Sequence, residues 1–498
     1  MLPLLFACVD PTDSAEGDTA VDSDDVASTL PTEAPLAEVD VVVIGSGAGG
    51  LASAWAAREA GASVLIVERA DTAGGATVNA GNYWAAGTTW QSAAGIEDSA
   101  ALAISEWSGF TGGDGDSPVV KAFVEGSAGV LDWLAGLGAG FGISSSVAAD
   151  TGSKPRFHQL SSEAGRPPVN VVAETLVGES WFLTTATELV LDGEAVAGVW
   201  VTDAAGAPGW IHAGAVVVAT GGFTRNDAIV HAALPALQDQ STWIEAFPGM
   251  DGNGLALAAA AGATEQNMDH LGLYAHGVAD ARHGQPEVMV IVGLDSSMVV
   301  DATGARVTDE RQFGSVAMGT RYLTEGPYYA IVDDVLWARI NLQGRGFNYL
   351  GDPEAMTLTG AEYEALHPVL LGEDAETLGT ALGIDGAGLA ASLQRYNSDA
   401  AAGTDTEYAK PSSSFTPLGK APLRGLPIVL GRSKSFGGLA TDLDGAVIRA
   451  DGSVIVGLYA AGEACGFLGD PAIGSGLNGS VTSAWWSGLL SGTSAASP

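Results

Sequence analysis

The sequence is poor in cysteine and in basic residues, and each shortage excludes certain kinds of site or classes of binding partner. Only two cysteines occur in 498 residues, Cys8 and Cys465. They are too few for a disulfide framework, a structural zinc site or an iron–sulfur cluster. The 59 Asp and Glu residues outnumber the 20 Lys and Arg residues, which gives a formal charge of −39. This acidity argues against nucleic acids and anionic membranes as partners, because both bind basic surfaces. We attribute it to solubility, with screening by salt, rather than to a specific cationic partner.

Long apolar runs are also missing, since the apolar stretches are rich in Gly and Ala and are interrupted by polar residues. At the N-terminus, residues 2–7 are apolar and residues 5–8 resemble a bacterial lipobox, which would make a lipidated Cys8 a membrane tether. However, the apolar run is short for a secretory signal and has no preceding Lys or Arg. Two locations therefore stay open: the bacterial cell envelope as a lipoprotein, or the cytoplasm with residues 1–38 as an acidic disordered segment.

Residues 39–69 predict a strand, a glycine turn, a helix and a second strand. Gly45, Gly47 and Gly50 have the G-x-G-x-x-G spacing, in which the glycines permit a tight turn, close approach of a pyrophosphate and close packing of helix on strand. Free N–H groups at the helix N-terminus would hold the pyrophosphate. Glu68 lies about 20 residues further on, where a carboxylate accepts a hydrogen bond from a ribose hydroxyl. The stretch therefore predicts a dinucleotide site.

The rest of the chain predicts an α/β protein with an insertion. Short strands are expected at 181–184, 186–191, 195–202 and 210–212, followed by a buried strand at 215–219. From about His270 to Arg432 the βαβ alternation disappears, and glycine turns return at 457–463 and 474–480. We therefore expect a leader and linker (1–38), a first nucleotide-binding part (39–269), an inserted domain (270–432) and a second nucleotide-binding part (433–498).

Four motifs in this order resemble the FAD-binding subunits of the fumarate reductase/succinate dehydrogenase superfamily, which includes flavocytochrome-type fumarate reductases and 3-ketosteroid dehydrogenases. The motifs are VVVIGSGAGGLASAWAAREAGASVLIVER, VVVATGGF, MDGNGLALAAAAGA, and GLYAAGEACG with its trailing GSGLNGS. The resemblance covers about residues 39–498. It implies a Rossmann-like FAD-binding domain interrupted by an α+β capping domain, with a small-molecule substrate held between the cap and a non-covalently bound FAD.

The resemblance also implies which residues surround the cofactor, from the pyrophosphate and adenosine ribose to the ribityl chain and the flavin ring. For the pyrophosphate and the adenosine they are Gly45, Ser46, Gly47, Gly49, Gly50, Glu68 and Arg69. Along the ribityl chain and the flavin they are Gly75, Ala76, Thr77, Thr220, Gly221, Gly462, Glu463, Ser475, Leu477 and Asn478. No metal site is expected.

The chain departs from this family where the relatives bind dicarboxylates. Relatives carry a substrate-protonating arginine a few residues after an N-E pair; here the pair is Asp309-Glu310 and the aligned position falls near Gly314. Lys434-Ser435-Phe436 stands where relatives carry a histidine before a late Gly-Gly, and residues 471–473 replace a late arginine. The late-loop tyrosine of ketosteroid dehydrogenases is missing too. Because a dianion would need those cations, we expect a neutral, apolar substrate, either an enone or a steroid-like molecule.

Three side chains are candidates for the chemistry. Arg311 lies nearest to the relatives' cap arginine and would serve as an acid or anion anchor, with an ion pair to Asp309 or Glu310 as the alternative. Tyr274 falls near the relatives' substrate histidine, with simple packing at the seam between cap and FAD domain as the alternative. Lys434 would polarise a substrate carbonyl or the flavin, unless it faces solvent.

We therefore predict an FAD-dependent oxidoreductase that transfers a hydride between flavin N5 and a CH–CH or C=C bond activated by a neighbouring carbonyl. Its electron donor or acceptor is unknown. Two alternatives stay open: a flavoprotein that has lost catalysis and serves as a surface or scaffold protein, and a fumarate reductase-like reductase of an unsaturated carboxylate. A site for NAD alone conflicts with the late Gly462-Glu463 and the second glycine turn.

Overall fold

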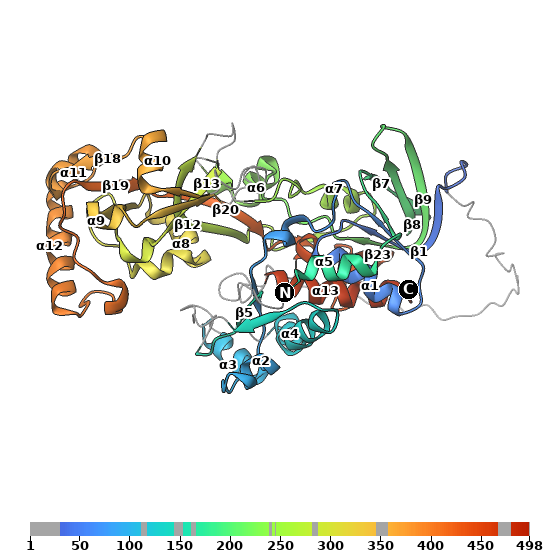
Figure 1. The fold of residues 1–498 in the computed structure, drawn as a ribbon. Helices are drawn as coiled ribbons and strands as arrows, with labels where there is room; N and C mark the ends of the chain where they lie inside the picture. Colours follow the sequence, from blue (N-terminus) through green and yellow to red (C-terminus); the bar gives the residue numbers. More distant parts are fainter. Residues whose placement is uncertain are drawn as a thin grey trace, which may run out of the picture.

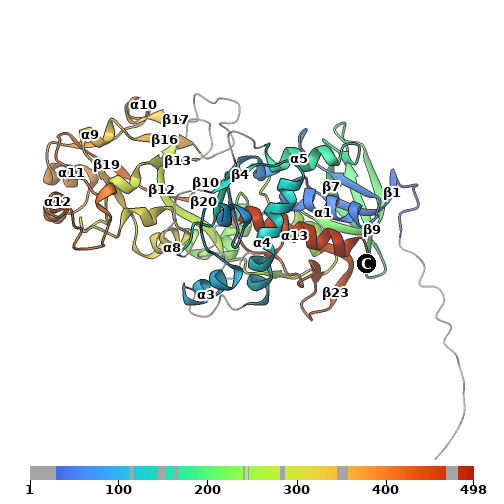
Figure 2. The same ribbon diagram turned by 60° about the horizontal axis from the view of Figure 1, so that its bottom comes forward.

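The computed structural model describes residues 30–110, 117–143, 153–160, 166–238, 242–244, 246–280, 287–344, 357–466 and 480–497. The molecule is elongated, with a large, mostly parallel sheet at one end and a smaller, mostly antiparallel part at the other (Figures 1 and 2). Cys8 and the rest of residues 1–29 lie outside the described ranges, as do Ser475, Leu477 and Asn478. Within those ranges no helix combines the length and the apolar character that crossing a membrane requires.

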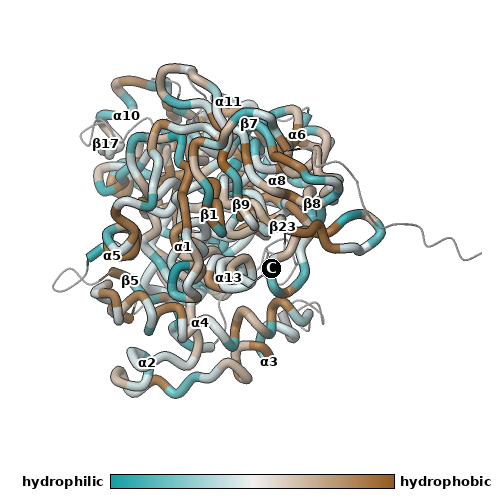
Figure 3. The backbone as a smooth tube through the Cα atoms, turned by 90° about the vertical axis from the view of Figure 1, so that its right-hand side faces the viewer, coloured by the Kyte–Doolittle hydropathy of each residue, from teal (hydrophilic) through white to brown (hydrophobic). Residues whose placement is uncertain are grey.

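The large sheet is built around β1, which pairs in parallel with both β2 and β9. Its strands follow the order β22-β23-β9-β1-β2-β6, and β7 and β8 extend it from β9 as an antiparallel hairpin. Residues 41–43 are fully buried, as expected for a strand covered on both faces. The hydrophobic stretches of chain gather around β1 and β9 (Figure 3). The bounds are β1 (Ala37–Ile44), β2 (Val64–Val67), β6 (Ser180–Trp181), β7 (Thr185–Asp192), β8 (Ala195–Thr202), β9 (Pro208–Val218), β22 (Ala446–Ile448) and β23 (Val454–Ala460).

One strand differs from its prediction. The two strands expected at 210–212 and 215–219 are a single strand, β9, which begins at Pro208 and ends at Val218. The small residues Ala213-Gly214 do not end the strand, because this part of β9 pairs with β1 and the backbone continues straight through it. The first half of β9 also pairs with β8. The hairpin and the core sheet are therefore one continuous surface.

Two helices from opposite ends of the chain lie against each other beneath the sheet (Figure 1): α1 (Ala48–Glu59) and α13 (Ser480–Ala495). Their backbones meet at small residues. A Cβ atom added to Gly488 would lie 2.3 Å from the carbonyl oxygen of Gly49, and one added to Gly492 would lie 2.1 Å from that of Ser53. Such distances exclude any side chain at these two glycines without separating the helices.

A helical layer covers the other side of α13, and a buried ion cluster holds it together. Arg156, whose side chain is fully buried, donates to Asp98 and Glu106 over 2.7–2.9 Å. His158 is also buried and pairs with the hydroxyl of Thr88. The layer contains α2 (Thr89–Ala93), α3 (Ala100–Phe110), α4 (Pro118–Gly136), α5 (Pro168–Thr175), β3 (Asn82–Trp84), β4 (Phe141–Ile143) and β5 (Phe157–Leu160).

The other end of the molecule carries two mostly antiparallel sheets with helices around them. The first runs in the order β10 (Thr242–Ile244), β20 (Val429–Ser435), β12 (Leu271–Asp280), β13 (Glu287–Val292), β16 (Asn341–Gly344) and β17 (Thr357–Thr359). The second consists of β14 (Met298–Val300), β15 (Tyr329–Val332), β19 (Leu423–Pro427) and β18 (Leu370–Gly372). Helices α8 (Val316–Glu325), α9 (Asp334–Trp337), α10 (Gly360–Leu366), α11 (Ala375–Leu382) and α12 (Gly386–Ala402) surround them.

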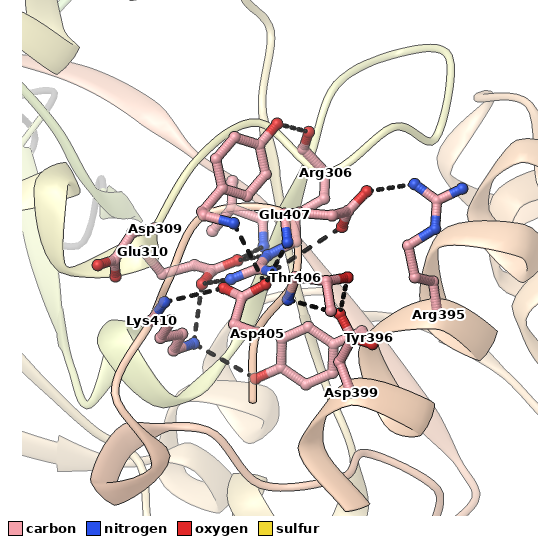
Figure 4. Close-up of polar contacts among 12 residues, drawn as sticks. Arg306, Asp309, Glu310, Arg395, Tyr396, Asp399, Asp405, Thr406, Glu407 and Lys410 are labelled. Carbon is pink, nitrogen blue, oxygen red and sulfur yellow. Dashed lines mark hydrogen bonds and ion pairs between the residues drawn. The ribbon is translucent and has the colours of Figure 1, made fainter. Parts of the chain in front are cut away.

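This arrangement confirms the predicted fold class, a Rossmann-like α/β part with an antiparallel capping part. The domain boundaries stay predictions: β10 precedes His270, and β20 continues past Arg432. The elements between the two parts are α6 (Asp227–Ala233), α7 (Asn253–Ala259), β11 (Glu265–Gln266) and β21 (Gly438–Leu439). Within the cap, four charged side chains form a fully buried cluster, which is drawn in Figure 4: Arg306, Glu310, Asp405 and Lys410.

Candidate functional site

A cavity of about 540 Å³ opens at the carboxyl ends of the parallel strands, where α/β proteins bind their ligands. Its walls come from the loops after β1, β2 and β9, from the start of α13, and from β16 and β20. The described lining residues are Ile44–Gly49 (44–49), 67–69, 75–77, Ala80, 184–186, 219–221, Phe247, Gly249, Met250, Asn253, Gln343, Gly344, Ser433, Lys434, Gly462, Glu463, Ser480, Val481 and Ala484.

The glycine loop at the start of α1 is shaped for close approach by a ligand. Gly45 has a φ of +102°, and a Cβ atom there would lie 2.5 Å from the carbonyl oxygen of Ala219 on the neighbouring loop. Gly50 faces inward instead, because its Cβ atom would lie 1.9 Å from the carbonyl oxygen of Gly45. The N-cap residue Gly47 has no side chain to cap the helix, and the Thr77 hydroxyl accepts from the N–H of Ala48 (2.9 Å). The helix presents its positive end and the remaining N–H groups of its first turn to the cavity.

Glu68 is fixed at one end of the cavity by three hydrogen bonds. One carboxylate oxygen accepts from the backbone N–H of Ser46 (2.8 Å) and from its hydroxyl (2.6 Å), and the other accepts from the N–H of Ala70 (2.8 Å). The neighbouring Arg69 is bound to Asp251 (2.7 Å) and to the carbonyl of Gly249 (2.6 Å). Hydrogen bonds therefore hold both residues of this wall, and Oε1 of Glu68 retains one lone pair for a hydroxyl donor.

The loop after β9 contributes a hydroxyl and an open surface. The Thr220 hydroxyl is buried and has no hydrogen-bond partner within the described residues, an arrangement that a bound polar ligand would satisfy. Gly221 has a φ of +83°, and a Cβ atom there would meet nothing within 4 Å. Both residues line the cavity. The backbone at Gly221 therefore lies open to whatever the cavity holds.

The opposite end of the cavity is made by Lys434 and Glu463. The Lys434 ammonium donates to the hydroxyl of Ser480 (3.3 Å) and lies 5.8 Å from the ring centres of both Tyr274 and Phe436. One oxygen of Glu463 accepts from the backbone N–H of Ser435 (2.6 Å) and from its hydroxyl (3.3 Å). Burial raises the pKa of the Glu463 carboxyl to about 7, although the Ser435 hydrogen bonds and the charge of Lys434 act in the opposite direction.

The residues predicted to hold the cofactor converge on this cavity. All of them that lie in the described ranges line it except Gly50, which packs α1 against the glycine turn. Ser475, Leu477 and Asn478 lie outside those ranges. Of the three catalytic candidates, Lys434 lines the cavity, whereas Tyr274 is buried behind it, stacked on His276 with 5.1 Å between ring centres.

Arg311 lies elsewhere. Its guanidinium forms an ion pair with Asp309 (2.6 Å), the alternative weighed for it from the sequence, and the two residues line a separate surface cavity with Ser315 and Tyr408. Sequence reasoning missed several lining side chains, among them Thr184, Thr185, Phe247 and Gln343. Nothing local marks these four, because they reach the cavity only through the packing of the β6–β7 turn, of the loop after β10 and of β16 against the glycine loops.

The cavity fits FAD on three observations. A helix N-terminus faces it through the Gly45-Ser46-Gly47 turn, whose one side chain, that of Ser46, is bonded to Glu68. Glu68 provides a fixed carboxylate one strand away, and the buried Thr220 hydroxyl lacks a partner among the described residues. Gly221 leaves room for an extended ligand, since a Cβ atom there would meet nothing within 4 Å. Gly49 instead lets α1 pack closely against the next wall of the cavity, because a Cβ atom on Gly49 would lie 2.8 Å from the backbone nitrogen of Gly462.

Comparison with known proteins agrees with this geometry. Residues 40–477 match the family described as FAD binding domain. The chain is 28% identical over 446 residues to a cytochrome-type fumarate reductase of Shewanella frigidimarina, covering 87% of this chain and 73% of that protein. It is 26% identical over 478 residues to a vinyl phenol reductase of Lactiplantibacillus plantarum, covering 92% and 96%. The structure of a 3-ketosteroid-Δ4-(5α)-dehydrogenase from Rhodococcus jostii RHA1 superimposes with a TM-score of 0.73 at 25% identity, covering 94% and 98%. The chain therefore belongs to the FAD-binding domain family, among the flavoproteins of the fumarate reductase/succinate dehydrogenase superfamily.

Proposed function

We propose that the protein transfers a hydride between FAD and a carbon–carbon bond next to a carbonyl group, on a neutral, apolar substrate such as an enone or a steroid-like ketone. As a member of its family the chain is an FAD-dependent oxidoreductase acting on CH–CH bonds. The observation that carries the finer proposal is that the described lining contributes a single cation, Lys434, at its end of the cavity. Arg69, the other cation in the described lining, is engaged by Asp251 at the far end.

One charge suits a carbonyl better than a dicarboxylate. A fumarate-like dianion needs several cations around it, and Arg311 is outside the cavity and paired with Asp309. The Lys434 ammonium instead lies beside the aromatic rings of Tyr274 and Phe436. Lys434 is half-buried, and a positive charge held partly out of bulk water polarises a neutral carbonyl more strongly than one in water. We propose Lys434 as the polarising group and Tyr274 as the residue that positions it.

The cofactor supplies the hydride chemistry when bound, and the chain supplies orientation and exclusion of water. We propose that Glu68 and Ser46 hold its adenosine end, that the N–H groups of α1 hold its pyrophosphate, and that Thr220 donates along its length. Non-covalent binding is supported by the composition of the cavity: its described lining contains no His, Cys or Tyr side chain that could form a covalent bond to the flavin.

A second candidate is reduction of an unsaturated monocarboxylate, with Lys434 as the carboxylate anchor. It is favoured by the names of relatives, which include a urocanate reductase of Eggerthella lenta at 27% identity over 483 residues and an NADH:acrylate oxidoreductase of Vibrio harveyi at 25% identity over 492 residues. A single cation can balance a single carboxylate. The two candidates therefore differ in the charge of the substrate and share the same residue.

Anaerobic flavin spectroscopy separates these possibilities. The flavin of the purified protein is reduced chemically, and enones, ketosteroids, acrylate-type monocarboxylates and fumarate are added in turn. We expect enones or ketosteroids to reoxidise the flavin, and we expect Lys434→Met to lower kcat/KM about 100-fold, the size of a lost electrostatic donor. Lys420→Met, at an exposed position on the cap, is the matched control.

Three results would count against the proposal. Efficient turnover of fumarate would show that the cavity holds a dianion after all. Turnover of monocarboxylates without turnover of enones would favour the second candidate. Full activity of Lys434→Met toward every accepted substrate would remove Lys434 from the chemistry.

A further inference from the structure

The carboxyl group of Glu463 has one enclosed oxygen and one open oxygen. The enclosed oxygen, Oε1, accepts from Ser435, and the backbone of Gly222 closes over it, since a Cβ atom on Gly222 would lie 2.6 Å from Oε1. The other oxygen, Oε2, has no hydrogen-bond partner among the described residues, and Glu463 lines the cavity. The open oxygen is therefore the one that meets the contents of the cavity.

The groups packed around this carboxyl are almost all uncharged. Its turn, Gly462–Ala464, contacts β20, β21, the loop after β9, the start of α1 and the start of α13. The residues that these elements contribute are Lys434, Ser435, Gly438, Gly221, Gly222, Gly49, Ser480 and Ser487. Lys434 is the one charged group in this set. A new charge in the cavity would therefore act on Glu463 with little local compensation.

Lys434 does not fully offset burial, which leaves the pKa of Glu463 at about 7. An ordinary carboxyl group is fully ionised at this pH. Near neutral pH, Glu463 is instead divided between its acid and its ionised form, so a modest change in nearby charge changes its proton content.

We propose that Glu463 takes up a proton from solvent when the bound cofactor is reduced and releases it when the cofactor is reoxidised. The proposal rests on the proposed function for the position of the flavin next to Lys434 and Glu463. A hydride brings two electrons, one proton and one net negative charge into the cavity. The proton taken up by Glu463 neutralises that charge by converting the carboxylate to a carboxylic acid, and the substrate proton is exchanged separately.

The reduction potential of the FAD-loaded protein, measured against pH, tests this coupling. For a two-electron couple, each proton taken up adds about 30 mV to the change in potential per pH unit. We expect the potential to fall more steeply above about pH 7, where the carboxylate form of the oxidised protein must gain its proton on reduction. Glu463→Gln should lose that extra slope. Ser435→Ala, which removes a hydrogen bond to the ionised form, should move the break to higher pH.

Infrared difference spectroscopy of the same electrochemical reduction reports on the proton directly. We expect a carboxylic acid C=O band to appear on reduction of the wild-type protein, to shift in D₂O, and to be absent from Glu463→Gln. Absence of this band from the wild-type protein would overturn the proposal. So would a wild-type potential that changes with equal slope below and above about pH 7, or a break that Ser435→Ala leaves at the same pH. These results decide the question even if Glu463→Gln fails to retain FAD. Reduction needs no substrate here, so failure of every enone would overturn the proposed function and leave this result intact.

Discussion

Two helical glycines, Gly50 in α1 and Gly129 in α4, differ in what surrounds them. A Cβ atom on Gly50 would lie 1.9 Å from the carbonyl oxygen of Gly45, whereas one on Gly129 would meet nothing within 4 Å. We expect Gly50→Ala to lose bound FAD and to destabilise the protein by about 1–3 kcal/mol, because the helix must move away from the glycine turn. Gly129→Ala should instead stabilise it by up to about 1 kcal/mol. Flavin absorbance per protein and thermal unfolding measure both effects, and equal behaviour of the two variants would contradict this account.

At this scale more of the expected cofactor residues than of the catalytic candidates lie at the cavity. Gly45, Gly47 and Glu68 are set by local geometry, since a turn, a helix start and a strand end fix where they lie. Arg311 and Lys434 depend on how distant strands pack. Arg311 follows Asp309 in a tight turn and is captured by it, an ion pair that spacing alone allowed as an alternative. The open cavity surface at Lys434 depends on β20 lying beside α13, and no sequence motif encodes that contact.

Within the cap, the segment after α12 that carries Asp405 and Lys410 is held in place by buried charges rather than by apolar packing (Figure 4). Arg306 on the turn after β14 contacts Glu310 (2.9 Å) and Asp405 (2.9 Å), and Lys410 contacts Glu310 (2.8 Å). Tyr396 from α12 accepts from Lys410 over 3.3 Å. The cluster joins the segment after α12 to the strand β14 region. Because the two cations and two anions are fully buried, removing one leaves an uncompensated charge.

Lys410→Met should therefore destabilise the protein by about 3–5 kcal/mol, the usual effect of breaking a buried ion pair. Lys420→Met, at an exposed position ten residues away, should change stability by less than about 0.5 kcal/mol. Unfolding in urea measures the difference. A small effect of Lys410→Met would mean that solvent reaches the cluster.

The same cluster predicts that the free energy of unfolding depends on pH in the acidic range. Burial opposes ionisation of Asp405, but hydrogen bonds from Arg306 and from the backbone of Lys410 and Glu407 outweigh it and lower its pKa from 3.8 to about 2. A lowered folded-state pKa stabilises the folded form above pH 3.8, and the stabilisation is lost as the pH falls from 3.8 toward 2. We expect about 2 kcal/mol to be lost across this window. Asp405→Asn should lack that loss, and parallel curves of unfolding free energy against pH for the two proteins would contradict it.

Prediction of strands succeeds where the hydrophobic periodicity is strong, and it fails where pairing with a distant strand sets the bounds. The apolar run of β1 and the alternation in β8 give both strands from sequence, with β8 at its predicted bounds, Ala195–Thr202. The merging of two expected strands into β9 depends on its long partner β1. The sheet order β23-β9-β1 is another non-local property, because β9 and β23 lie more than two hundred residues apart.

For the whole molecule, charge is the dominant property. A formal charge of −39 on 498 residues repels itself more strongly in the compact state than in the expanded one. We expect Tm to rise when salt increases from about 10 mM to about 150 mM, because the Debye length falls from about 30 Å to about 8 Å. The gain should shrink as the pH approaches the sequence pI of about 4.1. A Tm that is unchanged or lower in salt, measured by thermal unfolding, would show that local ion pairs outweigh the overall repulsion.

The contact between α1 and α13 has a consequence for how the protein is made. The nucleotide turn is synthesised more than four hundred residues before Gly488 and Gly492, which pack against Gly49 and Ser53. Strand β23, which borders β9, is also made long after that turn. A nascent chain therefore has no finished binding wall until α13 has been synthesised, and FAD can be loaded stably only after that point.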